Sequence, residues 1–365
     1  MTDRVQAILD FHDSRTLGKS DDFVSREKQA RAAYLSLNSA ELAELTALAI
    51  SRIEAGNNDF DATLCCIACL RPGSLLPFHD RLVESQILYP GVIFWQANAE
   101  TARRLLPLCE EEDLSNHALV SLAWIGDLTV QDAFVRWRDC PPPWVEKLYV
   151  PPHRYAEEAG WELTPEGARR NLFLSVAYPL VRPNSTRNVS DLVRVGIPAE
   201  DICPWCGRNL IGMLHFNDIG NVLHDQWKGA VRVLTCHVCS CYGHIFAKRN
   251  NKNFAKWHSM NAKPDYLPPD SSDWESFPES PLAMATETRH FMETANWLLP
   301  DASFSQVGGL PTWIQYSKYP TCPECSKKMR FIGQISNEDF EEAEGIYYAF
   351  YCETCGVTAT NYQQS

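Results

Sequence analysis

Cys203-Pro-Trp-Cys206 is the first of four C-x-x-C pairs that dominate the second half of the sequence. The others are Cys236-His-Val-Cys239, Cys322-Pro-Glu-Cys325 and Cys352-Glu-Thr-Cys355, with 29 residues between the first two pairs and 26 between the last two. Two thiolates three positions apart on a tight turn can bind one metal ion, and two such turns complete the tetrahedron that zinc prefers. The spacing therefore predicts two four-cysteine zinc sites, with all eight cysteines as ligands.

The composition of the turns agrees with this prediction, and three alternatives stay open. Glycine follows Cys206 and Cys355, and proline lies inside two of the pairs, as suits tight turns. In a crossed arrangement, the first pair would share its metal with the fourth. At the first site His237, Cys241 or His244 could replace a ligand, although we favour the interpretation that they are spare residues. The third alternative is that some pairs are core cysteines without a metal.

Short apolar segments between the cysteine pairs predict strands, because they are rich in β-branched and aromatic residues. The order of a C-P-x-C pair, two strands and a C-x-x-C pair occurs twice. It predicts two zinc-ribbon-like modules, residues 203–263 and 310–365. The expected strands are 210–216 and 230–234 in the first module and 329–335 and 346–351 in the second.

Residues 1–140 have the periodicity of helices. Apolar residues recur at helical spacing after Asn38-Ser39, a plausible cap. The segments 62–82 and 116–137 each combine an apolar helix, a short turn and an amphipathic stretch, and 89–112 is a further candidate unit. This pattern predicts a HEAT-like domain, since such units bury their apolar faces only against one another. An irregular helical domain is the alternative.

The expected fold class is therefore α+β, with a helical domain followed by a β-rich domain. Residues 141–200 are predicted to be a Pro-rich connection with one helix, from Thr164-Pro-Glu166 to about Tyr178-Pro179, and a polar stretch over 183–202. Residues 201–365 form the predicted two-zinc domain. An insert at 264–309 should contain a loop at 264–280 and a helix over 287–299.

Composition favours an ordinary globular protein of the cytoplasm. The chain has 365 residues, of which 45% are hydrophobic and 22% charged. A run of about 18 apolar residues, the length needed to span a membrane, is missing from the sequence. The start lacks the basic and then apolar layout of an export signal. The fourteen cysteines should therefore be reduced thiols rather than a disulfide framework.

The sequence favours a protein that is not an enzyme. Four thiolates close the shell of a zinc ion, whereas catalytic zinc usually keeps an open position. The motifs of zinc proteases, P-loops, dinucleotide folds and α/β-hydrolases are missing. Val307-Gly-Gly-Leu310 is interpreted as a turn rather than a phosphate loop. Cys66-Ile-Ala-Cys69 lies in an apolar helical segment, where cysteine behaves as a small core residue.

Charge is unevenly distributed along the chain. The net charge is −13, residues 203–263 carry +6, and residues 264–309 carry −7. The basic segment interleaves bases with an aromatic residue, which would suit a nucleic-acid contact. We favour the alternative, a solvated loop neutralised by the acidic insert. The candidate contact residues are Lys248, Arg249, Lys252, Lys256 and Trp257.

The last module carries a recognisable series of motifs: Val307-Gly-Gly-Leu-Pro-Thr-Trp-Ile-Gln315, Cys322-Pro-Glu-Cys325, Met329, Gln334-Ile335 and Tyr348-Ala-Phe-Tyr-Cys352. Residues 201–365 thereby resemble the YwqG-type bacterial domain of unknown function and the related eukaryotic programmed-cell-death-2 proteins. In such families the thiolates bind zinc and no catalytic residues are agreed. Bacterial relatives are often candidate immunity proteins of toxin systems, and eukaryotic relatives are chaperones of a ribosomal protein. The resemblance implies protein binding.

The favoured hypothesis is a non-enzymatic, cytoplasmic protein-binding protein with two structural zinc ions. Its acidic charge suits a basic protein partner, such as a toxin that it neutralises, because complementary fields favour the right partner. The alternatives are a zinc-ribbon protein that binds nucleic acid and a chaperone of a basic, ribosomal-type protein. We expect no membrane partner.

Overall fold

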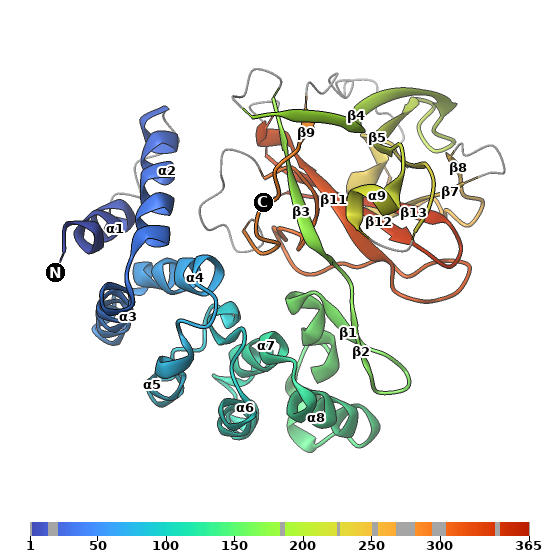
Figure 1. Ribbon diagram of the computed structural model, residues 1–365. Coiled ribbons are helices and arrows are strands. Elements are labelled where there is room, and N and C mark those ends of the chain that lie inside the picture. Colours follow the sequence, from blue (N-terminus) through green and yellow to red (C-terminus); the bar gives the residue numbers. More distant parts are fainter. Residues whose placement is uncertain are drawn as a thin grey trace. The chain divides into compact units, whose positions relative to one another are not determined.

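A computed structural model describes residues 2–13, 21–182, 187–224, 227–249, 255–267, 282–293, 304–339 and 344–364. The chain divides into two compact units, one that extends to Asn171 and one that begins at Leu172. The first is mainly helical and the second contains a large antiparallel sheet (Figure 1). The α+β class predicted from the sequence is confirmed.

The described residues of the helical unit form eight α-helices, and neighbouring helices pack side by side (Figure 1). No helix in the described part of the chain has the length and apolar character needed to cross a bilayer. The helices are α1 (Asp3–Asp13), α2 (Asp21–Ser36), α3 (Ser39–Glu54), α4 (Asp61–Leu70), α5 (His79–Glu84), α6 (Ala99–Leu105), α7 (Ser115–Ile125) and α8 (Leu128–Asp139).

Local signals set the helix ends in this unit. Asn38 accepts from the backbone N–H groups of Ala40 and Glu41, and Glu41 accepts from the N–H of Asn38, which is a complete capping box. Gly126 ends α7 in the left-handed conformation, and Asp127 caps α8. In α4, Cys65, Cys66 and Cys69 are at most 1% exposed, in accord with the core role predicted for this segment.

The helical unit extends 31 residues beyond its predicted end at residue 140. Short 3₁₀ turns at Pro143–Lys147 and Pro152–Ala159 lead to a hairpin of β1 (Trp161–Leu163) and β2 (Arg169–Asn171). Trp161 is fully buried, stacks on Phe134, and donates to the carbonyl of Ala123 at 2.7 Å. This anchoring makes residues 141–171 part of the helical unit rather than a connection.

The helix predicted from Thr164 to about Tyr178 was wrong. Thr164 begins the turn of the β1–β2 hairpin, with its N–H bonded to the carbonyl of Ala168, and Gly167 has a φ of +85°. Residues 174–181 form a strand. Thr-Pro-Glu satisfies the rules for a helix start, but Gly167 and the following β-prone residues favour a hairpin.

Eleven strands form the antiparallel sheet of the second unit, in the order β6-β5-β4-β9-β3-β10-β11-β12-β13-β7-β8. The strands are β3 (Leu174–Val181), β4 (Val189–Ile202), β5 (Asn209–Phe216), β6 (Val231–Thr235), β7 (Ile245–Arg249), β8 (Ala255–Trp257), β9 (Ala283–Ala285), β10 (Gln306–Gly309), β11 (Arg330–Ser336), β12 (Ile346–Cys352) and β13 (Val357–Gln363). A short helix, α9 (Ile219–Leu223), connects β5 to β6. The four strands predicted between the cysteine pairs are confirmed to within two residues.

The sheet curls upon itself in the manner of a barrel. Thr360 in β13 donates to Thr235 in β6 at 2.9 Å, although these strands are far apart in the strand order. One apolar core therefore receives side chains from most of the strands and from α9. It includes Leu174, Val193, Leu214, Ile219, Val231, Met284, Val307, Ile332 and Tyr347.

Two further predictions for this unit were wrong. The polar stretch expected over 183–202 contains β4, and the expected insert at 264–309 contributes β9 and β10, which lie inside the sheet. Residues 287–293 form a β-bridge at Arg289 and a turn instead of a helix. The remainder of that predicted helix and most of the loop at 264–280 lie outside the described residues.

Gly308 and Gly309 form part of β10 rather than a turn, and they produce a bulge opposite β3. Their φ angles are +72° and +71°, a region that residues with a Cβ rarely adopt. A Cβ on Gly308 would lie 2.1 Å from the carbonyl oxygen of Val176. The close approach of two strands thus explains this glycine pair.

Replacing Gly308 with alanine should therefore destabilise the sheet unit. The substitution adds left-handed strain and a backbone clash, and we expect a loss of at least about 2 kcal/mol in the free energy of unfolding. Urea unfolding of the full chain would measure it. Gly243→Ala is the control, because a Cβ there meets only Pro264 at 4.0 Å. Equal stability of the two variants would contradict this account of the bulge.

Candidate metal centres

Centre 1 consists of Cys203, Cys206, Cys236 and Cys239. The first two lie in the turn from β4 to β5, and the last two follow β6. Strand pairing brings the turns together, because Ile202 is opposite Asn209 and Ile211 is opposite Thr235. The end of β6 therefore lies beside the start of β5.

Centre 2 consists of Cys322, Cys325, Cys352 and Cys355. The first pair precedes β11, and the second lies at the junction of β12 and β13. Arg330 at the start of β11 is opposite Tyr351 near the end of β12. The structure thus brings together all eight predicted ligands, with the first pair beside the second and the third beside the fourth. The crossed arrangement is not found.

The sulfur positions fit one tetrahedral ion in each centre. Within each centre, all four sulfur atoms lie within 4.8 Å of one another. The Sγ–Sγ distances are 3.8 Å for Cys203–Cys239, 3.5 Å for Cys206–Cys236 and 3.6 Å for Cys325–Cys352. A tetrahedron with metal–sulfur distances of about 2.3 Å has edges of about 3.8 Å. A disulfide would require about 2.05 Å, so these are free thiols that could hold a metal ion.

The same backbone hydrogen bond shapes all four cysteine turns. In each turn, the residue after the second cysteine donates its N–H to the carbonyl of the first, at 2.9 to 3.0 Å. These donors are Gly207, Ser240, Ser326 and Gly356. Three of them have positive φ angles, including Ser326 at +59°. The turns are therefore closed by the backbone itself, which leaves the sulfur atoms free to bind a metal.

Some thiols of each centre are disfavoured as bare thiolates, whereas the pKa values of Cys203 and Cys325 are lowered by hydrogen bonds. Burial raises the pKa of the Cys352 thiol above its usual range, and burial together with Cys325 raises the pKa of Cys355 to about 11. In centre 1 the neighbouring Cys203 thiol raises the pKa of Cys236. A bound dication would reverse this effect, because an opposite charge favours the thiolate.

The alternative ligands considered for centre 1 lie outside both groups. The Nδ1 atom of His237 forms a hydrogen bond with the hydroxyl of Tyr347. The Nε2 atom of His244 lies 3.4 Å from the side-chain nitrogen of Asn361. Burial lowers the pKa of His244 to about 4. Cys241 is exposed. Their positions agree with the interpretation that they are spare residues.

The described candidate nucleic-acid contacts lie together on the paired strands β7 and β8, where Lys248 is directly opposite Lys256, but most of them have partners within the protein. Lys248 in β7 forms an ion pair with Glu324 of centre 2, and Trp257 in β8 packs edge-on against Trp205 of centre 1 at 5.1 Å. Arg249 donates to the carbonyl of Lys228 at 3.4 Å, whereas Lys256 is exposed. Lys252 lies outside the described residues.

The two centres are connected through paired strands, which no sequence pattern predicted. β7, which follows centre 1, pairs with β13, which follows centre 2, so that Lys248 is opposite Val357. Glu324 forms an ion pair with Lys248. The Nε2 atom of His258 also lies 3.2 Å from the Oε1 atom of Glu324. Lys248 and Glu324 are 76 positions apart in the sequence. No local sequence pattern predicts that Lys248 and Glu324 form a pair. A glutamate between two thiolate ligands does, however, predict that a cation lies nearby.

The chain is similar to a protein of Salmonella typhimurium named uncharacterized protein YpfL. The two are 36% identical over 307 residues, which is 82% of this chain and 71% of the relative. Neither structural unit has 307 residues, so the similarity includes parts of both. No protein-family model matches the chain. No solved structure matches it either.

Loss of one ligand should cost one metal ion. Cys239→Ser removes a fully buried ligand of centre 1, and we expect metal content to fall from two ions per chain to one. Cys241→Ser, two positions away, should keep both ions because Cys241 is exposed and outside the centre. Elemental analysis of the purified variants measures the difference. Two ions retained by Cys239→Ser would contradict the assignment.

Acid should release the metal from centre 2. The raised pKa values of Cys352 and Cys355 keep protons on these thiols in the metal-free state at neutral pH. Metal binding must expel these protons, so affinity rises with pH and falls as acid is added. We expect the apparent affinity to fall by at least about tenfold for each unit of pH below 8. Chelator competition would measure it, and an affinity that does not vary with pH would contradict the prediction.

Proposed function

The chain belongs to the YpfL family, and we propose that it is a non-enzymatic protein-binding protein with two structural zinc ions. The observation that carries the proposal is the arrangement of each centre, in which four thiols face one another from strand ends and turns. The proposal includes three further points: the metal is zinc, the chain binds a protein partner, and the chain lies in the cytoplasm.

Zinc is the metal favoured by the donor set. Four cysteine thiolates at tetrahedral separations suit zinc or an iron–sulfur centre. Zinc has no redox chemistry of its own and needs only one ion among the four sulfur atoms, which matches their close spacing. Reduced thiols are the normal state of cytoplasmic proteins, so the donor set is also consistent with that location.

A structural role follows from the number of ligands. Four protein ligands fill the shell of a tetrahedral ion, so water and substrate have no position at the metal. Cys203, Cys236 and Cys239 are at most 1% exposed, and Leu210, Val238 and Ile245 are among the apolar residues that pack around centre 1. Metal binding in such a site contributes directly to the free energy of folding.

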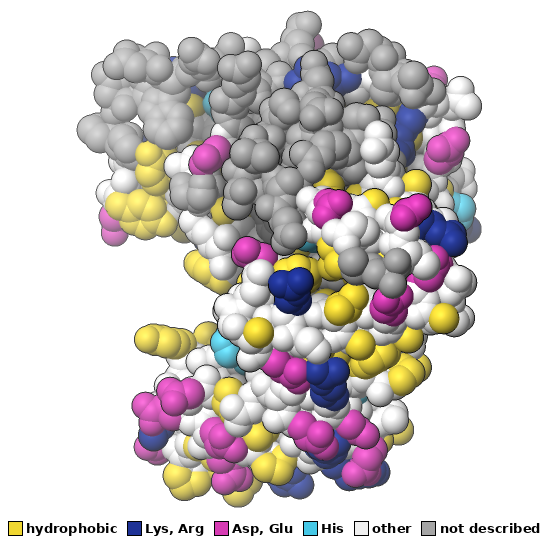
Figure 2. Space-filling model, turned by 90° about the vertical axis from the view of Figure 1, so that its left-hand side faces the viewer, with side chains coloured by type: hydrophobic (Ala, Val, Ile, Leu, Met, Phe, Trp, Pro, Cys, Tyr) yellow, Lys and Arg dark blue, Asp and Glu magenta, His cyan; other side chains and the backbone are white. Residues whose placement is uncertain are grey.

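A basic protein is the partner that the helical unit suits best. Residues 1–171 contain 26 acidic and 17 basic side chains, a net charge of −9. Figure 2 shows acidic and basic side chains intermingled over the lower part of the visible face. Exposed apolar side chains of the same unit, the usual anchors of protein interfaces, are Tyr89 at 61%, Leu128 at 74% and Tyr149 at 98%.

We further propose that the helical unit is a HEAT-like stack of helix pairs. Successive helices such as α3 and α4, α5 and α6, and α7 and α8 pack against one another and would present a continuous surface to a partner. The resemblance of the C-terminal unit to YwqG-type and programmed-cell-death-2-like proteins suggests two partners of this chemistry. One is a basic toxin that the chain neutralises as an immunity protein, and the other is a ribosomal-type protein that it chaperones.

The nucleic-acid alternative has less support from the described contacts. Lys248 is already neutralised by Glu324, and Trp257 packs on Trp205. Lys256 is exposed but lies in a unit with 20 acidic and 16 basic residues. Phosphate affinity comes mostly from unpaired cations, so we place nucleic acid second.

The test uses the full, metal-loaded chain and the products of the genes that flank its own gene. We expect one basic product to form a complex and the chain to relieve the growth arrest that this product causes. Tyr149→Ser should weaken the complex by about tenfold or more if Tyr149 is an anchor. Tyr266→Ser, which removes another exposed tyrosine from the sheet unit, is the matched control. No complex and no protection with any flanking product would reject the proposal.

A further inference from the structure

Three basic side chains lie next to one another across three strands of the sheet. Arg194 in β4 is directly opposite His215 in β5, and His215 is directly opposite Arg232 in β6. Directly opposed residues of antiparallel strands share a face of the sheet. The flanking residues Val193 and Phe216 belong to the apolar core. Since side chains alternate along a strand, the three basic side chains point outward.

Each of the three is held in place by a neutral contact. Arg194 Nη2 donates to His215 Nδ1 at 3.1 Å, which leaves the Nε2–H of the neutral imidazole as a donor. Arg232 Nη2 donates to the carbonyl of Pro198 at 3.1 Å. The Arg232 side chain packs over Gly212. A Cβ atom at Gly212 would lie only 2.8 Å from Arg232 Nε, so the absence of a side chain there makes room for the arginine. Both guanidinium groups are thus positioned without a carboxylate.

The cluster concentrates positive charge in an acidic chain. Within the residues that the structure describes, neither Arg194 nor Arg232 contacts a carboxylate, although the chain has 46 acidic residues. Burial, Arg194 and Arg232 lower the pKa of His215, so the two guanidinium charges act on the histidine between them. The two guanidinium charges lie on either side of His215 and repel each other, and an anion bound between them would remove that cost.

We propose that Arg194, His215 and Arg232 form a binding site for a phosphate group. Arginine forks match phosphate and carboxylate oxygens, and charge-assisted hydrogen bonds to them are strong. A phosphate presents three or four oxygens in different directions and can accept from two guanidinium groups and an imidazole at once. A carboxylate has only two oxygens in one plane. The arrangement of three donors on three adjacent strands therefore favours phosphate.

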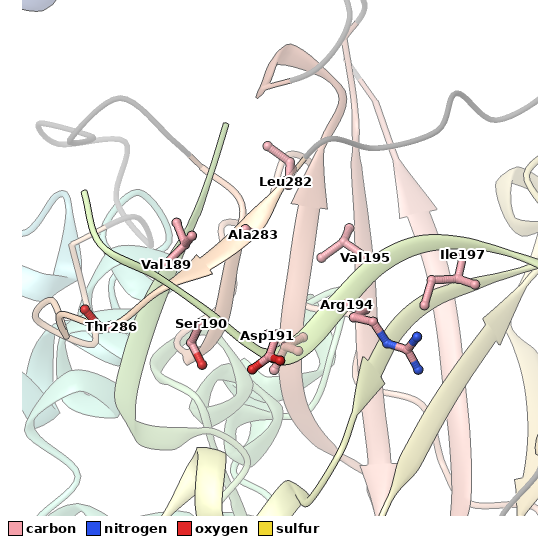
Figure 3. Close-up of a pocket in the computed structure, with 10 residues that line it drawn as sticks. Val189, Ser190, Asp191, Arg194, Val195, Ile197, Leu282, Ala283 and Thr286 are labelled. Carbon is pink, nitrogen blue, oxygen red and sulfur yellow. The ribbon is translucent and has the colours of Figure 1, made fainter. Parts of the chain in front are cut away.

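Arg194 also lines a nearby surface depression. That depression has a volume of about 750 Å³ and lies along β4 and β9, with Val189, Val195 and Leu282 among its lining residues. In Figure 3 the guanidinium group of Arg194 points away from Leu282 and Val189. The ligand would therefore contact the outer face of β4, β5 and β6.

The test is titration calorimetry of the full chain with inorganic phosphate and, in a second arm, with phosphoserine. We expect saturable binding in the millimolar range or tighter, and at least about a tenfold loss of affinity in Arg194→Gln and Arg232→Gln. Tighter binding of phosphoserine would identify a phosphate attached to a larger ligand, and tighter binding of inorganic phosphate would identify the free ion.

Lys256→Gln is the matched control, because it removes the same charge from an exposed position elsewhere on the sheet. It should bind phosphate as the unmodified chain does. If Arg232→Gln fails to fold, the variants His215→Gln and Arg194→Gln are used for the test instead. The metal content of each variant then shows whether it has folded. No saturable binding, or an equal loss in Lys256→Gln, would overturn the proposal. Neither result depends on which protein the helical unit binds.

Discussion

Convergence of four cysteine sulfur atoms at one point, repeated twice, is the constraint on which the sheet unit depends. The sulfur atoms of each centre lie within 4.8 Å of one another, and burial raises the pKa of several of these thiols. Such clusters are stable when a cation neutralises the thiolates, so metal binding to these centres would be coupled to folding. Ordinary strand pairing and four similar backbone turns bring the cysteines together, and the metal would fix that arrangement.

The two centres belong to one structure rather than to separate modules. Pairing of β7 with β13 joins the strands that leave the two centres, and Lys248 and His258 meet Glu324 inside a turn of centre 2. A change in one centre would therefore reach the other through a short path of paired strands. Since four sulfur atoms converge in each centre, a bound tetrahedral metal ion would have no open position.

The sequence predicted what depends on local pattern and missed what depends on distant contacts. The eight cysteines and their flanking strands were predictable because ligand spacing and β-propensity are properties of short segments. The strand β3 was missed because Thr164-Pro-Glu166 imitates a helix start, whereas the sheet stabilises the extended form of residues 174–181. Gly308 and Gly309 were interpreted as a turn because the cause of their conformation, the close approach of Val176 in β3 to Gly308, lies 132 positions earlier in the sequence. The position of Glu324 between two cysteines indicates a nearby cation, but no local pattern identifies Lys248, 76 positions away, as that cation.

The most direct measurement of the central claim is X-ray absorption at the zinc edge of the purified full chain. The account predicts four sulfur neighbours at about 2.3 Å around each zinc ion and no oxygen neighbour. An oxygen atom in the inner shell would contradict a closed structural site. Absence of zinc from the folded protein would contradict the account as a whole.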